Sequence, residues 1–297
     1  MDEEKFLADQ FEVHRRHLWS VAYRMLGSLT EADDAVQEAW LHIARAGAGG
    51  VENLRGWLTT VVARICLDLL RARKARREEP ENAHVPDPII ARDEAGAIAE
   101  PEREALLADS VGLALQVVLE TLDPAERLAF VLHDMFGLPF DKIALIVGRS
   151  PTAARQLASR GRRRVQSAPA PPDASPSRQR ELVNAFLAAS RAGNFAALVA
   201  LLDPDVVLRA DAGASPITRV VLGAANVAKQ AIFHQTTVSG PRVVRPAQVN
   251  GAAGVVVFKD GACESVLGFI VRGDKIVEID ILVDPDRVRR LDVSGLG

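Results

Sequence analysis

The sequence predicts a multidomain chain in which two all-α domains are followed by an α+β domain. Up to about residue 165 apolar residues recur at helical spacing, whereas after residue 177 short helices give way to β-branched runs. With 297 residues, 48% of them hydrophobic and 25% charged, the chain has a globular composition and enough length for about two domains. This composition excludes a disordered, collagenous or disulfide-stapled protein.

The chain has no segment that predicts a membrane or an export signal. No apolar run approaches the roughly 18–20 residues that cross a bilayer, and the sequence starts with the acidic run Met1-Asp2-Glu3-Glu4. We expect a cytoplasmic protein without a membrane partner. Cys66 and Cys263 are too few for a metal cage, so we expect reduced thiols, no metal and no cofactor.

Residues 1–77 are expected to form the first helical domain. Gly27 should end its first helix and Thr30 should cap the second, over 31–44, with a third helix over 54–73. The first helix has one apolar face, made by Leu18, Val21, Ala22, Met25 and Leu26.

Residues 78–105 are expected to be an acidic linker, because residues 78–109 hold ten acids against two bases and include several prolines. The second helical domain should span residues 106–166. Its helices are expected over 106–122, 124–136, 140–147 and 152–165. The last two, joined by Gly148-Arg149-Ser150-Pro151, have the spacing of a helix-turn-helix.

A proline-rich linker is expected over 167–178, and the α+β domain over 179–297. Gly273-Asp274 is a short hairpin connection, so the sheet is antiparallel at least there. Helices are predicted over 180–192, 194–202 and 223–234. Strands are predicted over 206–210, 219–222, 242–249, 254–259, 264–272 and 275–283.

Basic residues gather in two blocks, residues 64–77 and 149–164, although the net charge is −3. Phosphates respond to local charge, so the two blocks favour nucleic-acid binding. The second helix of a helix-turn-helix presents its first turns to the major groove. Thr152, Arg155, Gln156 and Ser159 are therefore candidates for base edges or phosphates, with Arg160, Arg162 and Arg163 nearer the backbone.

Two further groups of residues fit a nucleic acid and a protein partner. Asn53, Arg55 and Trp57 surround the start of a helix, where free N–H groups, an amide and a guanidinium could hold an unstacked base. Carboxylates beside a DNA-binding surface repel phosphates unless a basic protein partner takes them up. The second group, Asp33, Asp34, Gln37 and Glu38, therefore implies a protein partner.

Several segments together resemble a known family. They are Tyr23-Arg24-Met25-Leu26-Gly27, the stretch from Ala32 to Trp40, the stretch from Arg55 to Arg71, Leu122 to His133 and Ala153 to Arg160. In this order and spacing they resemble regions two and four of bacterial extracytoplasmic-function (ECF) RNA polymerase sigma factors. The resemblance covers residues 10–165.

The resemblance implies an alternative sigma factor that directs transcription initiation and is not an enzyme. The acidic group at 33–38 would dock on the beta-prime clamp helices of the RNA polymerase core. Thr152, Arg155, Gln156, Ser159, Arg160 and Arg163 would read the minus-35 promoter element. Asn53, Arg55, Trp57, Arg64, Asp68, Arg71 and Lys74 would melt and read the minus-10 element.

The last domain resembles the SnoaL-like, cone-shaped fold that a subset of these sigma factors carries. A cone encloses a pocket, which could hold a small ligand. Candidates for chemistry there are Asp211, His234, Glu264 and Asp280, although for each of them a place at a strand edge or on the surface is the favoured interpretation.

Members of that subset share a proline-containing linker motif, a glycine-rich loop and an acidic tail motif. Their counterparts here are Val85-Pro86-Asp87-Pro88, Asp211-Ala212-Gly213-Ala214 and Asp284-Pro285-Asp286-Arg287-Val288. We expect regulatory contacts from Pro86, Asp87, Pro88, Asp211, Asp284, Pro285 and Asp286. The domain would then regulate the sigma factor from within the same chain.

Two other interpretations remain open at this point. The chain could be a one-component helix-turn-helix regulator whose last domain senses a small molecule, or a cone-fold enzyme with DNA-binding appendages. The acidic group at 33–38 argues against the first, and no complete catalytic set supports the second. We expect a monomer, because one sigma factor serves one polymerase.

Overall fold

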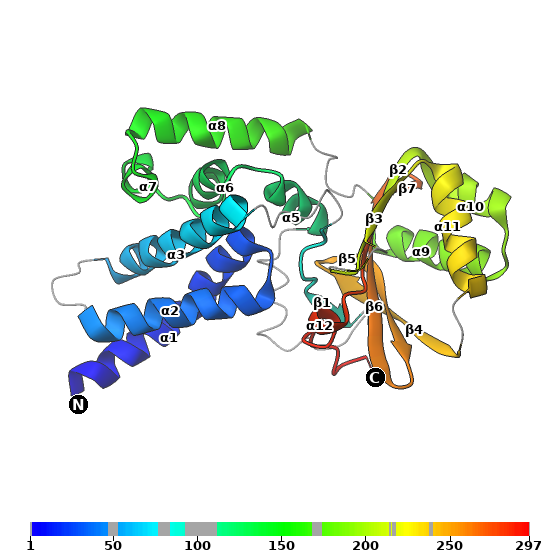
Figure 1. Cartoon of the computed structure of the whole chain (residues 1–297), viewed down its shortest axis with the longest axis horizontal. Coiled ribbons are helices and arrows are strands. Elements are labelled where there is room, and N and C mark those ends of the chain that lie inside the picture. Colours follow the sequence, from blue (N-terminus) through cyan, green and yellow to red (C-terminus); the bar gives the residue numbers. More distant parts are fainter. Residues whose placement is uncertain are drawn as a thin grey trace. The chain divides into compact units, whose positions relative to one another are not determined.

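The computed structural model describes residues 2–46, 53–76, 84–92, 112–167, 174–213, 215, 218–237 and 240–296. The chain divides into two compact units (Figure 1). The first comprises residues 1–79 and 118–169, and the second comprises residues 80–117 and 170–297. The second unit therefore includes part of the segment that connects the two predicted helical domains.

The first unit begins with three long helices, α1 (Asp2–Leu26), α2 (Leu29–Ala46) and α3 (Leu54–Arg76) (Figure 1). The predicted apolar face of α1 is buried from Leu18 to Leu26, and it packs against both other helices. Its burial removes apolar surface from water, which is the main force that holds helices of this kind together.

The connection between α1 and α2 is partly as predicted. Gly27 has a φ of 72°, the left-handed conformation that commonly ends a helix. The prediction that Thr30 caps α2 is wrong, because α2 already begins at Leu29. Ser28 is the cap instead: its hydroxyl accepts a hydrogen bond from the N–H of Glu31 at 3.5 Å.

The remaining helices of the first unit confirm the helix-turn-helix. They are α6 (Pro124–Phe130), η1 (Val131–Met135), α7 (Phe140–Val147) and α8 (Pro151–Ser167). The preceding helix, α5 (Leu113–Glu120), includes the division between the units, which falls after residue 117. The helix expected over 124–136 is α-helical only to Phe130 and continues as a π-helical turn. Gly148, with a φ of 69°, ends α7, and the hydroxyl of Ser150 accepts a hydrogen bond from the N–H of Ala153 at the start of α8.

The second unit is built on a seven-stranded sheet with the order β1-β4-β5-β6-β7-β2-β3. The strands are β1 (Ile90–Arg92), β2 (Leu202–Asp211), β3 (Arg219–Leu222), β4 (Arg242–Val249), β5 (Ala252–Lys259), β6 (Ala262–Arg272) and β7 (Lys275–Leu282). The predicted β6–β7 hairpin is antiparallel, as are all neighbouring pairs except β2 and β7, which are parallel. The α+β class is confirmed.

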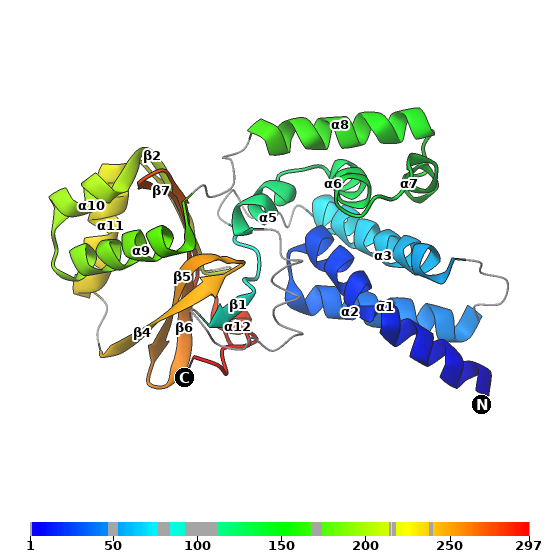
Figure 2. The same cartoon turned by 180° about the vertical axis from the view of Figure 1, so that it is seen from behind.

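The sheet is covered differently on its two faces. The helices α9 (Pro176–Arg191), α10 (Phe195–Leu201) and α11 (Ala224–Thr237) lie against one face (Figure 2). The core between them includes Phe186 and Phe269, whose ring centroids are 5.6 Å apart. The short helix α12 (Pro285–Val288) packs on β6. Because side chains alternate along a strand, neighbours of these core residues point to the opposite face.

Candidate nucleic-acid interface

The candidate residues on α3 divide between two sides of the helix. Asn53, Trp57, Arg64, Asp68 and Arg71 follow one another at intervals of three, four or seven residues, which places them on one face. Arg64, Asp68 and Arg71 are exposed there, whereas Trp57 is half-buried. This face offers a half-buried indole at one end and guanidinium groups farther along.

The start of α3 is capped by the side chain of Asn53. The side-chain oxygen of Asn53 accepts a hydrogen bond from the N–H of Gly56 at 2.8 Å. A Cβ at Gly56 would lie 3.2 Å from the Asn53 amide nitrogen, so this tight turn favours glycine. The cap sets where α3 begins, and with it the position of Trp57.

Arg55 lies apart from the other candidates, on the side of α3 that faces α1. Its guanidinium donates a hydrogen bond to Nδ1 of His17 at 3.1 Å, because arginine has no acceptor. Nε2 of His17 is 3.0 Å from the hydroxyl of Thr59. The structure therefore connects Arg55 to α1. The helical period of 3.6 residues already indicates that Arg55 lies on a different side of α3 from Trp57 and Arg64.

The last candidate on α3, Lys74, forms an ion pair with Asp123. Its neighbour Arg73 turns inward: it donates to the carbonyl of Leu26 at 3.3 Å and pairs with Glu31. The basic block at 64–77 therefore includes cations that have structural partners. Arg64 and Arg71 are the exposed guanidinium groups of the candidate face, and Nη1 of Arg71 lies 3.5 Å from Oδ1 of Asp68 on the same face.

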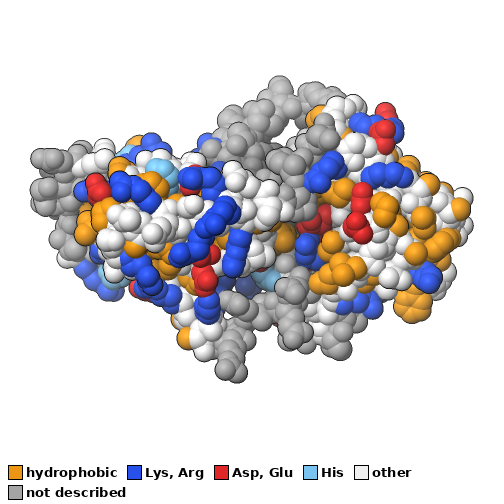
Figure 3. Space-filling view, turned by 90° about the horizontal axis from the view of Figure 1, so that it is seen from above, with side chains coloured by type: hydrophobic (Ala, Val, Ile, Leu, Met, Phe, Trp, Pro, Cys, Tyr) orange, Lys and Arg blue, Asp and Glu red, His pale blue; other side chains and the backbone are white. Residues whose placement is uncertain are grey.

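The helix α8 has a buried face and an exposed polar face. The buried residues are Ala154, Leu157, Ala158 and Gly161. The opposite face is exposed, and its candidates return once in each helical turn: Thr152, then the adjacent Arg155 and Gln156, then Ser159 and Arg163. Lys and Arg side chains gather on the surface over α8 (Figure 3). This arrangement matches the recognition helix of a helix-turn-helix.

Packing against α6 sets the position of α8. A Cβ at Gly161 would lie 3.0 Å from Cβ of Phe130 and 3.2 Å from the carbonyl oxygen of Glu126, so glycine allows the two helices to approach closely. Arg160 donates from Nε to the buried Glu126 at 2.6 Å. Of the candidates on α8, Arg160 therefore has a partner within the domain. So do Arg162, which donates from Nε to Asp134 at 2.9 Å, and Arg155, whose guanidinium lies 5.5 Å from the centroid of the Phe140 ring.

The acidic candidates on α2 are all exposed. Asp33 and Gln37 form one i,i+4 pair, and Asp34 and Glu38 form a second. Burial raises the pKa of Asp33, although a hydrogen bond from Trp19 and the charge of Arg15 act in the other direction. Four polar side chains with three carboxylates thus project from one side of the helix.

A hollow of about 390 Å³ adjoins this acidic group between α1 and α2. Asp33 and Gln37 line it together with Phe11, Arg15 and Trp40. The rings of Phe11 and Trp40 are 5.2 Å apart and tilted at 52°. Sequence reasoning missed Phe11 and Arg15, whereas Trp40 ends the motif that carried the family resemblance. This surface therefore combines the carboxylates of α2 with the aromatic rings of Phe11 and Trp40, which line the hollow.

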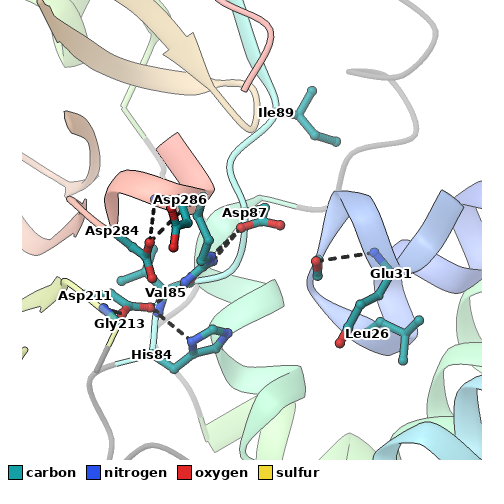
Figure 4. A network of polar contacts seen from close by, with 12 residues as sticks. Leu26, Glu31, His84, Val85, Asp87, Ile89, Asp211, Gly213, Asp284 and Asp286 are labelled. Atoms are coloured by element: carbon teal, nitrogen blue, oxygen red, sulfur yellow. Dashed lines mark hydrogen bonds and ion pairs between the residues drawn. The ribbon is translucent and has the colours of Figure 1, made fainter. Parts of the chain in front are cut away.

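In the second unit, Arg287 connects two of the predicted regulatory segments. Its guanidinium donates from Nε to Asp87 at 2.7 Å and from Nη1 to Asp211 at 2.7 Å. It also donates to the carbonyl of Val85. All four side chains of residues 85–88 are buried. Figure 4 shows Asp87, Val85 and Asp211 gathered around this contact.

Asp211 accepts further hydrogen bonds. The N–H of Val85 lies 2.9 Å from Oδ2, that of Gly213 lies 2.9 Å from Oδ1, and His84 forms an ion pair at 3.0 Å. Burial alone would raise the pKa of Asp211, but these hydrogen bonds, with that of His84 the strongest, hold it well below its usual range. Asp211 therefore remains ionised at neutral pH.

The tail motif supports this contact through its backbone. Oδ1 of Asp284 accepts from the N–H groups of Asp286 and Arg287 and so caps α12. A Cβ at Gly213, whose φ is 64°, would lie 2.2 Å from Oδ2 of Asp284. Pro285 occupies the first turn of α12, and Asp286 is an exposed partner of Arg289.

The linker segment also joins the sheet as its edge strand. Ile90, Ala91 and Arg92 pair antiparallel with β4, opposite Val249, Gln248 and Ala247. Before them, Ile89 and Asn250 exchange hydrogen bonds of 2.6 and 2.8 Å. Sequence reasoning missed His84, Arg287 and this strand, since the partners are 76 to 202 residues apart.

The three carboxylates among the candidates for chemistry in the second unit form ion pairs with arginine side chains. Arg242 donates two hydrogen bonds to Glu264, which lowers the pKa of that carboxyl. Asp280 is 1% exposed and contacts Arg209, which also pairs with Glu278. Burial and the charge of Glu278 raise the pKa of Asp280 to about 8.

Neither Asp280 nor Asp211 lies among the apolar side chains beneath the helices. Leu208 and Ile279 belong to that core, so Arg209 and Asp280, the next residues on their strands, point to the other face. His234 is exposed, and partial desolvation together with the charge of Arg242 lowers its pKa. These residues do not assemble the acid–base pair that an enzyme would need.

Comparisons with known proteins match the two helical regions of the chain. The family model of Sigma-70 region 2 matches residues 10–76, and that of Sigma-70, region 4 matches residues 112–165. These regions define the class of bacterial sigma factors. In the part of the chain that the structure describes, no helix has the length and apolar character to cross a membrane.

Similarity to particular proteins extends over nearly the whole chain. A probable ECF RNA polymerase sigma factor, SigI of Mycobacterium tuberculosis, is 34% identical over 288 residues, 96% of each chain. The ECF RNA polymerase sigma factor SigJ of the same organism is 34% identical over 308 residues, 97% of each chain. The crystal structure of SigJ covers 96% of this chain and 99% of its own, with 33% identity and a TM-score of 0.72. The chain therefore belongs to the ECF RNA polymerase sigma factors, which are transcription initiation factors and not enzymes.

Proposed function

We propose that this sigma factor reads two promoter elements with two separate helices. The exposed face of α8, with Arg155, Gln156 and Arg163, would enter the major groove of the minus-35 element. The face of α3 with Trp57, Arg64 and Arg71 would hold unstacked bases and phosphates of the minus-10 element. Asp68 and Asn53 would complete that face.

The observation that carries this proposal is the division of α8 into a buried and an exposed face. Ala154, Leu157 and Gly161 pack inward, so five polar residues of the predicted recognition set are left accessible on one side. Arginine can bind guanine through two hydrogen bonds, and glutamine can bind adenine in the same way. Arg160, which is hydrogen-bonded to Glu126, would help to position α8 and would contact DNA only at the margin of the exposed face.

We infer that the acidic group on α2 binds the beta-prime clamp helices of the polymerase core. Asp34 and Glu38 would pair with basic residues of a helix, and the neighbouring hollow would receive an apolar side chain beside Trp40. Transcription takes place in the bacterial cytoplasm, so we propose that the protein is cytoplasmic. Because one sigma factor serves one polymerase, we propose that it binds as a monomer.

The second unit would regulate the sigma factor by binding its linker. In a complex with polymerase, the linker residues 84–92 would have to leave the sheet in order to run through the polymerase. In this structure Arg287 binds Asp87 and Asp211 binds Val85, and these contacts hold the linker on the sheet. The helical side of the sheet is occupied by an apolar core around Phe186 and Phe269. We therefore base the regulatory role on contacts within the chain rather than on a small ligand.

The site assignments can be tested by capture of core polymerase and by promoter protection. Purified full-length chain is incubated with core polymerase, and the complex is footprinted on a promoter selected from a random library. Arg163→Ala should weaken protection at minus 35, and Arg64→Ala should weaken protection at minus 10. Equal loss at both elements from each variant would contradict separate readers. A chain that binds DNA but not polymerase would instead be a one-component regulator.

A further inference from the structure

The arginines of α8 differ in where they lie around the helix. A period of about 3.6 residues per turn places Arg163 within the exposed face. Arg160 and Arg164, four residues apart, lie along one border of that face, and Arg162 lies along the other border. We call these three residues the border arginines. Their side chains are 43–52% exposed, so each of them reaches solvent.

On the first border, a buried carboxylate lies between two guanidinium groups. Arg160 donates from Nε to Oε1 of Glu126 on α6 at 2.6 Å, and Nη1 of Arg164 lies 3.8 Å from Oε2. The side chain of Glu126 is 8% exposed, and its Oε2 accepts no hydrogen bond within the part of the chain that the structure describes. One negative charge therefore lies against both border arginines of this side.

On the second border, a carboxylate of η1 does the same. Asp134, whose side chain is 20% exposed, accepts two hydrogen bonds from Arg162, one from Nε at 2.9 Å and one from Nη2. All three border arginines are thus paired with carboxylates of α6 and η1. Arg163, between the borders, forms no ion pair or hydrogen bond with any residue that the structure describes.

The borders of a recognition helix are where DNA phosphates would lie. A helix in the major groove meets base edges with its outer face, and the two phosphate backbones run along its sides. Arginines on the borders would therefore bind phosphates, and such contacts supply nearly all of the affinity for non-specific DNA. A guanidinium beside a carboxylate attracts a phosphate weakly, because the attraction of the cation and the repulsion of the anion largely cancel.

We propose that Glu126 and Asp134 are specificity-determining residues, which neutralise the border arginines and so make DNA binding by α8 depend on the base contacts of its exposed face. Non-specific DNA vastly outnumbers promoters in a genome, so a lower affinity for phosphates favours the correct sites. This inference rests on the proposed function, since it requires that α8 reads the minus-35 element.

Replacement of each carboxylate by its amide tests the proposal in the complex of the full-length chain with core polymerase. Glu126→Gln and Asp134→Asn keep an acceptor oxygen and remove the charge. Each complex is titrated at several salt concentrations with two duplexes that end upstream of minus 10 and carry either an intact or a scrambled minus-35 element.

Both variants should bind DNA more tightly and with less discrimination. We expect a rise of about 3- to 10-fold in affinity for the scrambled duplex. The slope of log K against log salt should steepen by about 1–2 for Glu126→Gln, which frees two arginines, and by about 1 for Asp134→Asn. The ratio of affinities for the intact and scrambled duplexes should fall, because non-specific binding is almost wholly electrostatic.

Asp274→Asn is the matched control. It removes the same charge from an ion pair in the second unit, where Asp274 accepts from Nε of Arg178 at 2.8 Å, and it should change neither affinity nor slope. Thermal unfolding followed by circular dichroism checks that the variants fold. If Glu126→Gln does not fold, Asp134→Asn still decides, because its side chain is partly exposed.

Unchanged or weaker binding of the scrambled duplex by the folded amide variants, or discrimination equal to that of the wild type, would overturn the proposal. Weaker binding with a shallower slope would show that the carboxylates orient the arginines toward phosphates instead. A wild-type complex that binds the two duplexes equally would contradict the proposed role of α8 itself.

Discussion

Arg287 donates a hydrogen bond to Asp87, 200 residues earlier in the chain, and a second one to Asp211, 76 residues earlier. One guanidinium thereby holds a segment of the linker on the carboxyl-terminal domain. All three side chains are largely buried, so the contact depends on complete pairing of their charges.

Replacement of Arg287 should release the linker. Arg287→Ala leaves Asp87 and Asp211 buried without their cation, and we expect a loss of about 3–5 kcal/mol of stability in the second unit. Hydrogen exchange of residues 84–92 should become faster by orders of magnitude. Arg289→Ala, which removes an exposed partner of Asp286, should change stability by less than about 0.5 kcal/mol. Equal protection of the linker in both variants would refute the role of Arg287.

Stability of the second unit should decrease between pH 6 and pH 8. Asp280 has a folded-state pKa raised to about 8, so the folded state keeps a proton that the unfolded chain has lost above pH of about 4. The stabilisation is therefore complete below the unfolded pKa and is lost as pH rises toward 8. Asp280→Asn should flatten this dependence.

The three tryptophans all lie in the first unit, at positions 19, 40 and 57, so fluorescence does not report on the second unit. Hydrogen exchange of β2 and β7 peptides, corrected for the intrinsic pH dependence of exchange, is the suitable measurement. A wild-type protein as stable at pH 8 as at pH 6 would show that Asp280 ionises at its ordinary pKa. Asp211 acts in the opposite sense, since its depressed pKa adds stability that is lost only as pH falls below about 4.

The acidic group on α2 should decide polymerase binding. Asp34→Ala combined with Glu38→Ala should abolish capture of core polymerase, because two carboxylates of the docking face are removed. The pair Asp141→Ala and Asp205→Ala changes net charge equally at exposed positions elsewhere and should bind as the wild type does. Retained capture by the α2 variant would place the docking surface outside 33–38.

Loss of a phosphate contact and loss of a base contact on α8 should change the salt dependence of DNA binding differently. Arg163→Ala should reduce the slope of log K against log salt by about 1, as expected for one lost phosphate contact. Gln156→Ala should leave the slope unchanged and relax sequence preference within the minus-35 element, by about 1–3 kcal/mol at one base pair. If the two variants change slope and preference alike, α8 does not use these residues differently.

The sequence predicted much of the fold because the signals were local. The limits of β3, β4 and α7 agree with the predicted ranges, and the alternation of small and polar residues on α8 indicates its buried side. Thr30 was a wrong choice of cap because Ser28, two residues earlier, offers the same chemistry. Local patterns of this kind cannot choose between neighbouring caps.

The linker contact could not be predicted in the same way. Asp87, Asp211 and the tail were proposed as regulatory from resemblance, but no periodicity relates residues 76 to 202 positions apart. Arg287, the cation that unites them, stood inside the tail motif and was overlooked. Two acidic residues that are buried together require a cation beside them. This requirement is the signal that could have identified Arg287.

The most direct measurement of the central claim is run-off transcription by the full-length protein with purified core polymerase on a promoter selected from a random library. The account predicts initiation at one start site that depends on the added chain, with Arg287→Ala changing the rate but not the start site. Specific DNA binding without any initiation would contradict it and would identify a helix-turn-helix regulator that does not direct polymerase.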